Sequence, residues 1–217
     1  VIDFVIGEPQ IVFFDNFENG LDDWDVNGDW GLSSDVFSGL FALSDSPDGD
    51  YQDGQETFAE YIREVDLQFI SNPVIKFNAK WDIESSYDFV RFQALITDSG
   101  WVSLSGQYTE TGSGQPAQAF GEHGYDGLQE DWVEETIYLD HLDESQITGF
   151  RFIQTSDNFV EGDGFSLDNF QILGYPTGLI GDFNSDAGVD IFDILGLADL
   201  LLFGADPSQA QLFFCDL

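Results

Sequence analysis

Hydrophobic and polar residues alternate with a period of two along much of this chain. Segment 74–81 alternates apolar side chains with Asn78 and two lysines, and segment 89–97 alternates them with Arg91 and Gln93. Such alternation is typical of strands that have one buried and one exposed face. Strands are predicted near residues 10–15, 29–32, 40–44, 58–66, 74–81, 89–97, 101–104, 134–139, 150–155 and 165–173.

Glycine, aspartate and asparagine turns separate these runs, and no helical pattern interrupts them before residue 172. The pattern predicts an all-β fold, namely a jelly-roll β-sandwich. The glycine-rich loop 106–127 is the segment expected to carry a binding surface. Residues 1–6 (VIDFVI) are also strand-like and end before Pro9, so they are expected to form an N-terminal arm or the tail of a preceding domain.

The periodicity changes to that of a helix after a short hinge at 175–178. Apolar residues recur at i, i+3 and i+4 from Ile191 to Leu202, and Gly204 is a natural stop. Further apolar residues, ending with Phe203, make this helix apolar nearly all round, so it must be covered on more than one side. The predicted organisation is an arm at 1–9, the sandwich at 10–174, a linker at 175–180 and a small helical module at 181–217.

An acidic loop precedes this helix and has the spacing of a calcium site. Asp182, Asn184 and Asp186 alternate, Asp190 follows, and Asp193 stands at the twelfth place. Oxygen side chains at places one, three and five with a carboxylate at twelve are the ligand set of an EF-hand-type loop for Ca²⁺. The simpler alternative is an acidic turn that begins a helix.

The charge balance restricts the partners and the environment. The 217 residues include 42 acids and only five bases, which gives a net charge of −37. Nucleic acid is excluded as a partner because phosphate contacts need Lys and Arg, and anionic membranes are excluded on the same ground. Self-repulsion of this size strains a compact state. Bound calcium or a salty medium would relieve it, and both indicate a secreted, extracellular or cell-surface protein.

Other features of the composition exclude several classes of protein. A hydrophobic content of 42% with 22 Phe argues against disorder. The single cysteine, Cys215, excludes a disulfide within one chain. No apolar run approaches the roughly 18 residues that a membrane span needs. The chain has no methionine, so we expect Val1 to follow a processing boundary.

Catalytic motifs are absent from the sequence. There is no His-Glu-x-x-His zinc motif and no Gly-x-Ser-x-Gly elbow, and neither His123 nor His141 has a second histidine at metal spacing. A glycosidase-type carboxylate pair has no distinguishing signal among 42 acids. We therefore expect no catalytic residues in this chain.

Seven motifs in order carry a resemblance to a known domain. They are 14–20 (FDNFENG), 30–32 (WGL), 44–51 (SDSPDGDY), 125–127 (YDG), 132–133 (WV), 151–152 (RF) and 162–168 (GDGFSLD). Over residues 13–173 the chain resembles the MAM-like jelly-roll domain of secreted bacterial metallopeptidases of the immune-inhibitor-A and zinc-carboxypeptidase types. The resemblance implies a non-catalytic accessory sandwich, which in that family is often calcium-bound.

Four acids of the sandwich are candidates for structural calcium. Glu18 and Asp168 would lie on the first and last strands, which are neighbours in a jelly roll, with Asp45 and Asp50 on a nearby turn. Carboxylates are ligands that Ca²⁺ prefers. The alternative is that these acids only cap turns and remain solvated.

Residues 181–217 resemble a dockerin-type repeat, in which two calcium loops each precede a helix. The resemblance assigns the five oxygen side chains of the acidic loop as ligands, with Ala187 and Gly188 shifting the flexible position by one. The recognition places carry Ile191 and Phe192 in place of hydroxyl residues, which argues against a cohesin of the cellulosome type. Asp216 resembles the opening of a second loop, so the second repeat is expected to be truncated.

Three functions remain open. The first is a non-catalytic, calcium-stabilised accessory region, whose partner would be a parent catalytic domain. The second is a self-assembling extracellular filament or surface protein, with contacts between copies made by the 1–6 arm, the C-terminal helix and the apolar tail 212–217. The third is a carbohydrate-binding jelly roll. Its candidate stacking platforms are Trp101, Tyr108, Tyr125 and Trp132, and the favoured alternative is that these aromatics belong to the core.

Overall fold

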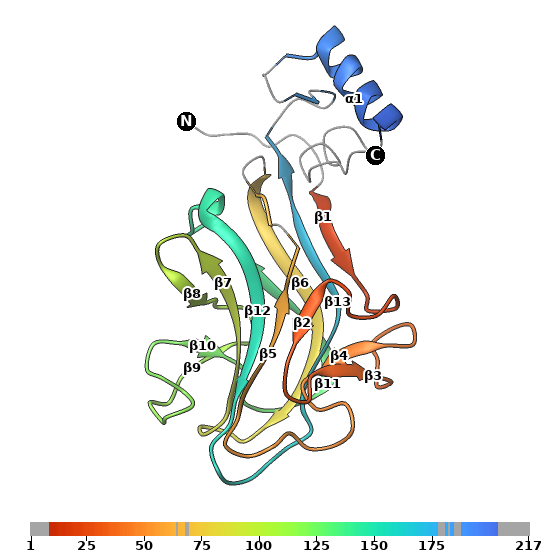
Figure 1. Cartoon of the computed structure of the whole chain (residues 1–217). Coiled ribbons are helices and arrows are strands. Elements are labelled where there is room, and N and C mark those ends of the chain that lie inside the picture. Colours follow the sequence, from red (N-terminus) through yellow and green to blue (C-terminus); the bar gives the residue numbers. More distant parts are fainter. Residues whose placement is uncertain are drawn as a thin grey trace.

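The computed structural model describes residues 9–63, 65–67, 70–177, 181, 183–184 and 188–203, apart from the side chains of Glu144 and Pro176. Two antiparallel sheets lie face to face and form a β-sandwich, which is consistent with the predicted jelly roll (Figure 1). The N-terminal arm 1–6 and the apolar tail 212–217 lie outside the described residues.

The larger sheet has β13 (Gly164–Pro176) at its centre. Its strand order is β11 (Gly127–Tyr138), β6 (Ile70–Ile83), β13, β4 (Ala42–Ser44) and β3 (Gly31–Ser33), and β1 (Gln10–Asp15) also pairs with β13. β4 pairs with the first part of β13 and β1 with the second. The pairing of β1 with β13 confirms that the first and last predicted strands are neighbours.

The smaller sheet has the order β2 (Trp24–Val26), β5 (Glu56–Tyr61), β12 (Ile147–Thr155), β7 (Phe89–Ile96) and β8 (Gly100–Ser103). A short ribbon of β9 (Glu110–Thr111) and β10 (His123–Gly124) lies within the glycine-rich loop, and a 3₁₀ turn occupies Glu144–Gln146. The sequence did not predict β2, β9 and β10. Each has only two or three residues, which is too short for a period of two to be visible.

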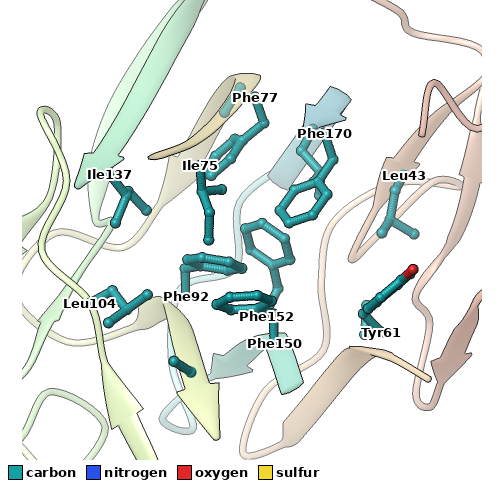
Figure 2. Packing of buried hydrophobic residues seen from close by; sticks show 14 of the residues in the cluster. Leu43, Tyr61, Ile75, Phe77, Phe92, Leu104, Ile137, Phe150, Phe152 and Phe170 are labelled. Atoms are coloured by element: carbon teal, nitrogen blue, oxygen red, sulfur yellow. The ribbon is translucent and has the colours of Figure 1, made fainter. Parts of the chain in front are cut away.

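Aromatic side chains from both sheets fill the space between them. Phe77 and Phe170 of the larger sheet meet Phe92 and Phe152 of the smaller one (Figure 2). All four are buried. Large aromatic rings supply much of the apolar area that drives folding, so this cluster is the centre of the core.

β6 runs through Pro73, although the sequence pattern suggested that the strand began at Val74. Proline removes a backbone donor and is tolerated in sheets mainly at irregular positions. Here the register of β6 against β13 shifts between Leu173 and Tyr175, and Asn72 has a left-handed backbone with φ 49°. The irregularity accommodates the proline inside a long strand.

The predicted C-terminal helix is α1 (Ile191–Phe203). Figure 1 places it beyond the end of β13. Its apolar side chains are largely exposed, each with more than half of its surface accessible: Ile191, Phe192, Ile194, Leu195, Leu201, Leu202 and Phe203. None of the described helices is long and apolar enough to cross a membrane.

Candidate metal centre

Glu18 and Asp168 bind the same short segment of backbone from two sides. Glu18 lies three residues after β1, and its Oε1 accepts hydrogen bonds from the N–H of Leu40 at 2.6 Å and of Phe41 at 2.9 Å. Asp168 lies on β13 and accepts one from the N–H of Ser38 at 2.9 Å. The pairing of β1 with β13 therefore brings two predicted ligands to one segment, residues 38–41.

The neighbouring Gly39 allows this close approach. Its φ is +74°, a left-handed conformation that favours glycine, and a Cβ at this position would overlap the carboxylate of Glu18. The two backbone N–H groups lower the pKa of Glu18. Burial raises the pKa of Asp168, backbone N–H bonds oppose the rise, and the charge of Glu18 adds to it. The two carboxylates therefore repel one another electrostatically.

Asp45 lies in a different place, in the turn after β4. Its side chain is buried, and its Oδ1 accepts hydrogen bonds from the Phe165 N–H at 2.9 Å and the Ser46 hydroxyl at 2.7 Å. Its Oδ2 is buried without a hydrogen-bond partner among the described residues. Burial raises the pKa of Asp45 to about 7, and the charge of Asp163 adds to this rise. An unpartnered buried carboxylate oxygen is costly unless it is protonated or meets a cation.

Asp45 also lines a cavity of about 10 Å³ together with Gln154, whose Nε2 is buried without a hydrogen-bond partner among the described residues. A space of this size holds about one water molecule. Asp50, by contrast, is exposed and lies in an open hollow beside Asp48.

Two of the sequence motifs, 44–51 and 162–168, pack against each other. The Ser46 hydroxyl lies 2.8 Å from the carbonyl oxygen of Asp163 as well as 2.7 Å from Oδ1 of Asp45, so its one proton is shared between them. The Tyr51 N–H donates to the carbonyl of Gly162 at 3.0 Å. Gly164 has φ +79°, and a Cβ there would overlap Asp45. The motifs are therefore two sides of one turn structure at an end of the sandwich.

Three acids that the sequence did not single out come together at one end of the sandwich, where β6 and β12 end and β7 begins. Glu84 follows β6, Asp88 precedes β7 and Asp157 follows β12. Each offers a carboxylate oxygen, and these oxygens all lie within 4.8 Å of one another. We call this group the acid triad.

Tyr51 connects the acid triad to the turn structure. Its hydroxyl donates to Oδ2 of Asp88 at 2.7 Å and accepts from the Glu84 N–H at 3.1 Å. Oδ1 of Asp88 accepts from the Asp157 N–H at 2.6 Å. Oε2 of Glu84 is buried and has no hydrogen-bond partner among the described residues. The triad therefore keeps acceptor capacity that the described residues leave unused.

Burial and mutual repulsion act on these acids in the same direction. Burial raises the pKa of Asp88, and the charges of Asp157 and Asp53 raise it further, against the hydrogen bonds from Tyr51 and the Asp157 N–H. The pKa of Glu84 is raised by burial first and then by the charges of Asp88, Asp157 and Asp53. A cation among these carboxylates would reverse both effects.

The basic residues do not neutralise these sites. Among the described residues, no lysine or arginine nitrogen lies within 4.0 Å of a carboxylate of the triad, of Asp45 or of Asp168. The ion pairs that do form use acids with more exposed side chains: Arg63 with Asp23, Lys76 with Glu134, Lys80 with Asp35, and Arg91 with Glu56 and Glu122. The least exposed acids thus lack a positive partner in the described part of the chain.

The acidic loop before α1 is described in part, and Asp182 and Asp186 lie outside the described residues. Asp193 is buried, and its carboxylate accepts from the Asn184 N–H at 3.2 Å and from the Asp190 N–H at 2.6 Å. Oδ1 of Asp190 accepts from the Phe192 N–H at 2.8 Å. These bonds form a reciprocal N-terminal cap, and the bonds to Asp193 lower its pKa.

This cap is what the simpler alternative, an acidic turn that begins a helix, requires. It leaves the calcium loop a prediction.

The aromatic residues proposed as stacking platforms differ in their access to solvent. Tyr125 is fully buried in the core, which is the favoured alternative for these aromatics and excludes it as a platform. Tyr108 packs against Trp81, and Trp132 lies beside Phe37. Trp101 is half-buried, and the guanidinium of Arg151 lies 4.2 Å from the centre of its ring.

No protein-family model matches this sequence, and no curated protein is similar to it. One similar solved structure is the CBM22-1 xylan-binding domain of Xyn10C from Paenibacillus barcinonensis. It is 13% identical, the match covers 77% of this chain and 96% of that chain, and the TM-score is 0.46. The K2 cleaved adhesin domain of Lys-gingipain is 16% identical, and the match covers 74% of this chain and 98% of that chain with a TM-score of 0.45.

A third similar structure is TmCBM61, described in complex with β-1,4-galactotriose. It matches at 13% identity over 73% of this chain and 94% of that chain, with a TM-score of 0.45. Scores and identities this low establish neither a common fold nor a common ligand. The β-sandwich assignment therefore rests on the strand order itself.

Proposed function

We propose that this chain is a non-catalytic, calcium-stabilised accessory region of a secreted bacterial protein, derived from a metallopeptidase. One observation carries the calcium part. The acid triad brings three carboxylate oxygens within 4.8 Å of one another, with no lysine or arginine beside them in the described part of the chain.

The geometry of the triad suits calcium. Ca²⁺ takes six to eight oxygen ligands at about 2.3–2.6 Å, so oxygens this close together can all reach one ion. Glu84 has a buried oxygen without a partner, and Asp88 is fully buried yet keeps its carboxylate among other acids. A divalent cation would offset both the desolvation and the repulsion that raise the pKa values of these groups.

The same chemistry supports a secreted location. Extracellular calcium modules bind at about 10⁻⁴–10⁻³ M, a range that saturates only in calcium-rich media. A net charge of −37 also favours an environment with abundant cations. The metallopeptidase origin is supported by the packing of motifs 44–51 and 162–168 into one turn structure through Ser46 and Tyr51.

Calorimetry of the intact chain tests this proposal. We expect the melting temperature to rise when EDTA is replaced by millimolar calcium, because an ion that binds only the folded state stabilises it by mass action. Magnesium at the same concentration controls for ionic screening. Equal melting temperatures in EDTA and in calcium would refute the calcium part. A reading frame that encodes no peptidase domain in the same protein would refute the origin.

Self-assembly is the second candidate, and the exposed apolar surface of α1 favours it. Seven large apolar side chains of this helix are each more than half exposed, which is unusual for a monomer. A second copy that covers the helix would bury them. Light scattering after size exclusion in calcium separates the candidates, since a monomer at all concentrations contradicts self-assembly.

A further inference from the structure

The outer face of the smaller sheet carries an ordered row of polar side chains. The strand registers place Asp25, Glu60, Arg151, Gln93 and Ser103 opposite one another across β2, β5, β12, β7 and β8. The neighbours of Arg151 on β12 are Phe150 and Phe152, which point into the core, so Arg151 points outward. One row of hydrogen-bonding groups thus crosses all five strands.

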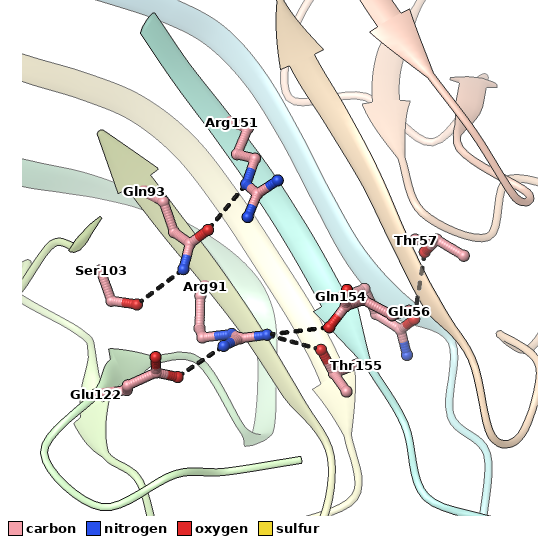
Figure 3. A network of polar contacts seen from close by, with 9 residues as sticks. All are labelled: Glu56, Thr57, Arg91, Gln93, Ser103, Glu122, Arg151, Gln154 and Thr155. Carbon is pink, nitrogen blue, oxygen red and sulfur yellow. Dashed lines mark hydrogen bonds and ion pairs between the residues drawn. The ribbon is translucent and has the colours of Figure 1, made fainter. Parts of the chain in front are cut away.

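Hydrogen bonds hold Arg151 in place from one side. Its Nε donates to Oε1 of Gln93 at 2.8 Å, and Nε2 of Gln93 is 3.2 Å from the Ser103 hydroxyl (Figure 3). Its guanidinium lies over the ring of Trp101 at 4.2 Å, a cation–π contact. The side chain is therefore fixed before any ligand arrives, which reduces the entropy lost on binding.

Arg151 differs from the other four bases. Each of those has a carboxylate oxygen within 4.0 Å, whereas Arg151 has none among the described residues, although Glu60 is its direct cross-strand neighbour. Its two Nη groups have no described hydrogen-bond partner either. In a chain with 42 acids, an arginine with no described carboxylate oxygen within 4.0 Å leaves a fork of donors for another molecule.

A second arginine completes the face. Nη1 of Arg91 pairs with Glu122 at 2.6 Å, and Nη2 donates to the Thr155 hydroxyl at 2.8 Å (Figure 3). Its Nε is buried without a hydrogen-bond partner among the described residues. The face therefore interleaves the donors of two arginines with the acceptors Asp25, Glu56, Glu60 and Glu122, so acids outnumber bases there.

We propose that this face binds an uncharged, hydroxyl-rich polymer, namely a neutral polysaccharide. The proposal rests on the proposed function as an interaction region and names its partner. Sugar hydroxyls both donate and accept, so they match a face in which the Nη donors of Arg151 lie beside the acceptor Glu60, with the buried Gln93 holding the guanidinium in place. The net charge of −37 and the acids of the face disfavour a polyanion, and the cationic side chains of a basic peptide offer no acceptor to the Arg151 fork.

Affinity electrophoresis against soluble neutral glucans, mannans and galactans, with polygalacturonate as the charged counterpart, tests the proposal. The protein is kept in millimolar calcium at about 0.15 M salt, where the screening length is about 8 Å. We expect at least one neutral polymer to retard the protein and polygalacturonate to leave it unretarded. Titration calorimetry then gives the affinity for that polymer.

Two variants locate the site. Arg151→Lys keeps the positive charge and loses the fork, and we expect it to weaken binding at least about tenfold. Lys76→Ala removes a charge from β6 of the opposite sheet and should leave the affinity unchanged. If Arg151→Lys does not fold, Glu60→Gln replaces it, since Glu60 is in no described ion pair and its loss should also weaken binding.

Several outcomes would overturn the inference: no neutral polymer binds, polygalacturonate binds better, or both face variants bind as the parent does. The calcium shift of the melting temperature is measured on the same samples. A retained shift without glycan binding removes the proposed face and keeps the proposed function. If calcium does not shift the melting temperature but a glycan binds, the proposed function is refuted and the binding face is kept.

Discussion

The acid triad predicts two opposing effects of one substitution, a gain of stability from relieved repulsion and a loss of calcium binding. Glu84→Gln removes one negative charge and keeps the size of the side chain. The carboxylate of Glu84 makes no hydrogen bond that the described residues show, so the substitution breaks no described bond. Without metal it should relieve repulsion from Asp88 and Asp157, and with calcium it should remove a ligand.

The magnitudes follow from the separations. Two unit charges 4.8 Å apart repel by about 1 kcal/mol in a water-like medium and by about 3 kcal/mol at an effective dielectric of about 20. Because Glu84 is partly exposed, we take the lower value and expect a gain of about 1–2 kcal/mol in EDTA. Calcium at a hundred times its Kd stabilises the parent by about 2.7 kcal/mol, and a tenfold weaker site loses about 1.4 kcal/mol of that.

The assay is differential scanning calorimetry of both proteins in EDTA and in calcium. For a chain of this size about 1 kcal/mol shifts the melting temperature by roughly 2–4 °C, so both signs are measurable. We expect Glu84→Gln to melt above the parent in EDTA and to show the smaller calcium shift. Asp131→Asn, an exposed acid on β11, is the matched control and should change neither value.

A variant that is less stable than the parent in EDTA would refute the argument from repulsion. A calcium shift equal to that of the parent would remove Glu84 from the ligand set. Both results together would mean that the triad binds no ion, and that any calcium effect arises at another site.

Three further predictions use the core, the buried Asp45 and the helix. Phe152→Ala, at the centre of the aromatic cluster, should lower the free energy of unfolding in urea by about 3–5 kcal/mol, and an unchanged value would contradict the packing. The pKa of Asp45 is about 7 in the folded state against 3.8 ordinarily. Its protonation therefore contributes fully to the free energy of unfolding below about pH 4, and this contribution is lost as the pH rises to about 7. In EDTA, Asp45→Asn should remove this part of the pH dependence, up to about 4 kcal/mol; parallel parent and variant profiles would contradict it. If α1 mediates self-association, Leu202→Glu should abolish it in light scattering, whereas the same change would leave a monomer unaffected.

The sequence predicted the sandwich well because its long strands each bury one face. Strands such as β6 and β7 alternate apolar and polar residues over many positions, so their period is visible without a partner. β2 has three residues and exists through its pairing with β5, from Trp24 opposite Tyr61 to Val26 opposite Ala59. Information of that kind lies in the partner strand and leaves no local pattern.

The candidate sites divide in the same way. The encounter of Glu18 with Asp168 was predictable, since it needs only that the first and last strands are neighbours. The acid triad was not, because Asp157 is 69 residues from Asp88 and each of them is one acid among 42. What brings them together is the common end of β6, β7 and β12, which lie in two different sheets. Only the three-dimensional arrangement distinguishes these acids from the rest.

The least exposed acids also show why net charge alone does not call for calcium. Glu135 is fully buried, yet its carboxylate accepts from the backbone N–H groups of Gln107, Tyr108 and Thr136 and from the Tyr125 hydroxyl. Four donors satisfy that carboxylate without any cation.

Asp45 and Glu84 differ from Glu135, because each keeps a buried oxygen with no described donor and each has other acids nearby. A cation can therefore stabilise the fold at these two residues to an extent that it cannot at Glu135. The calcium requirement, if calorimetry finds one, should map to the end of the sandwich where Tyr51 lies between Asp45 and the acid triad.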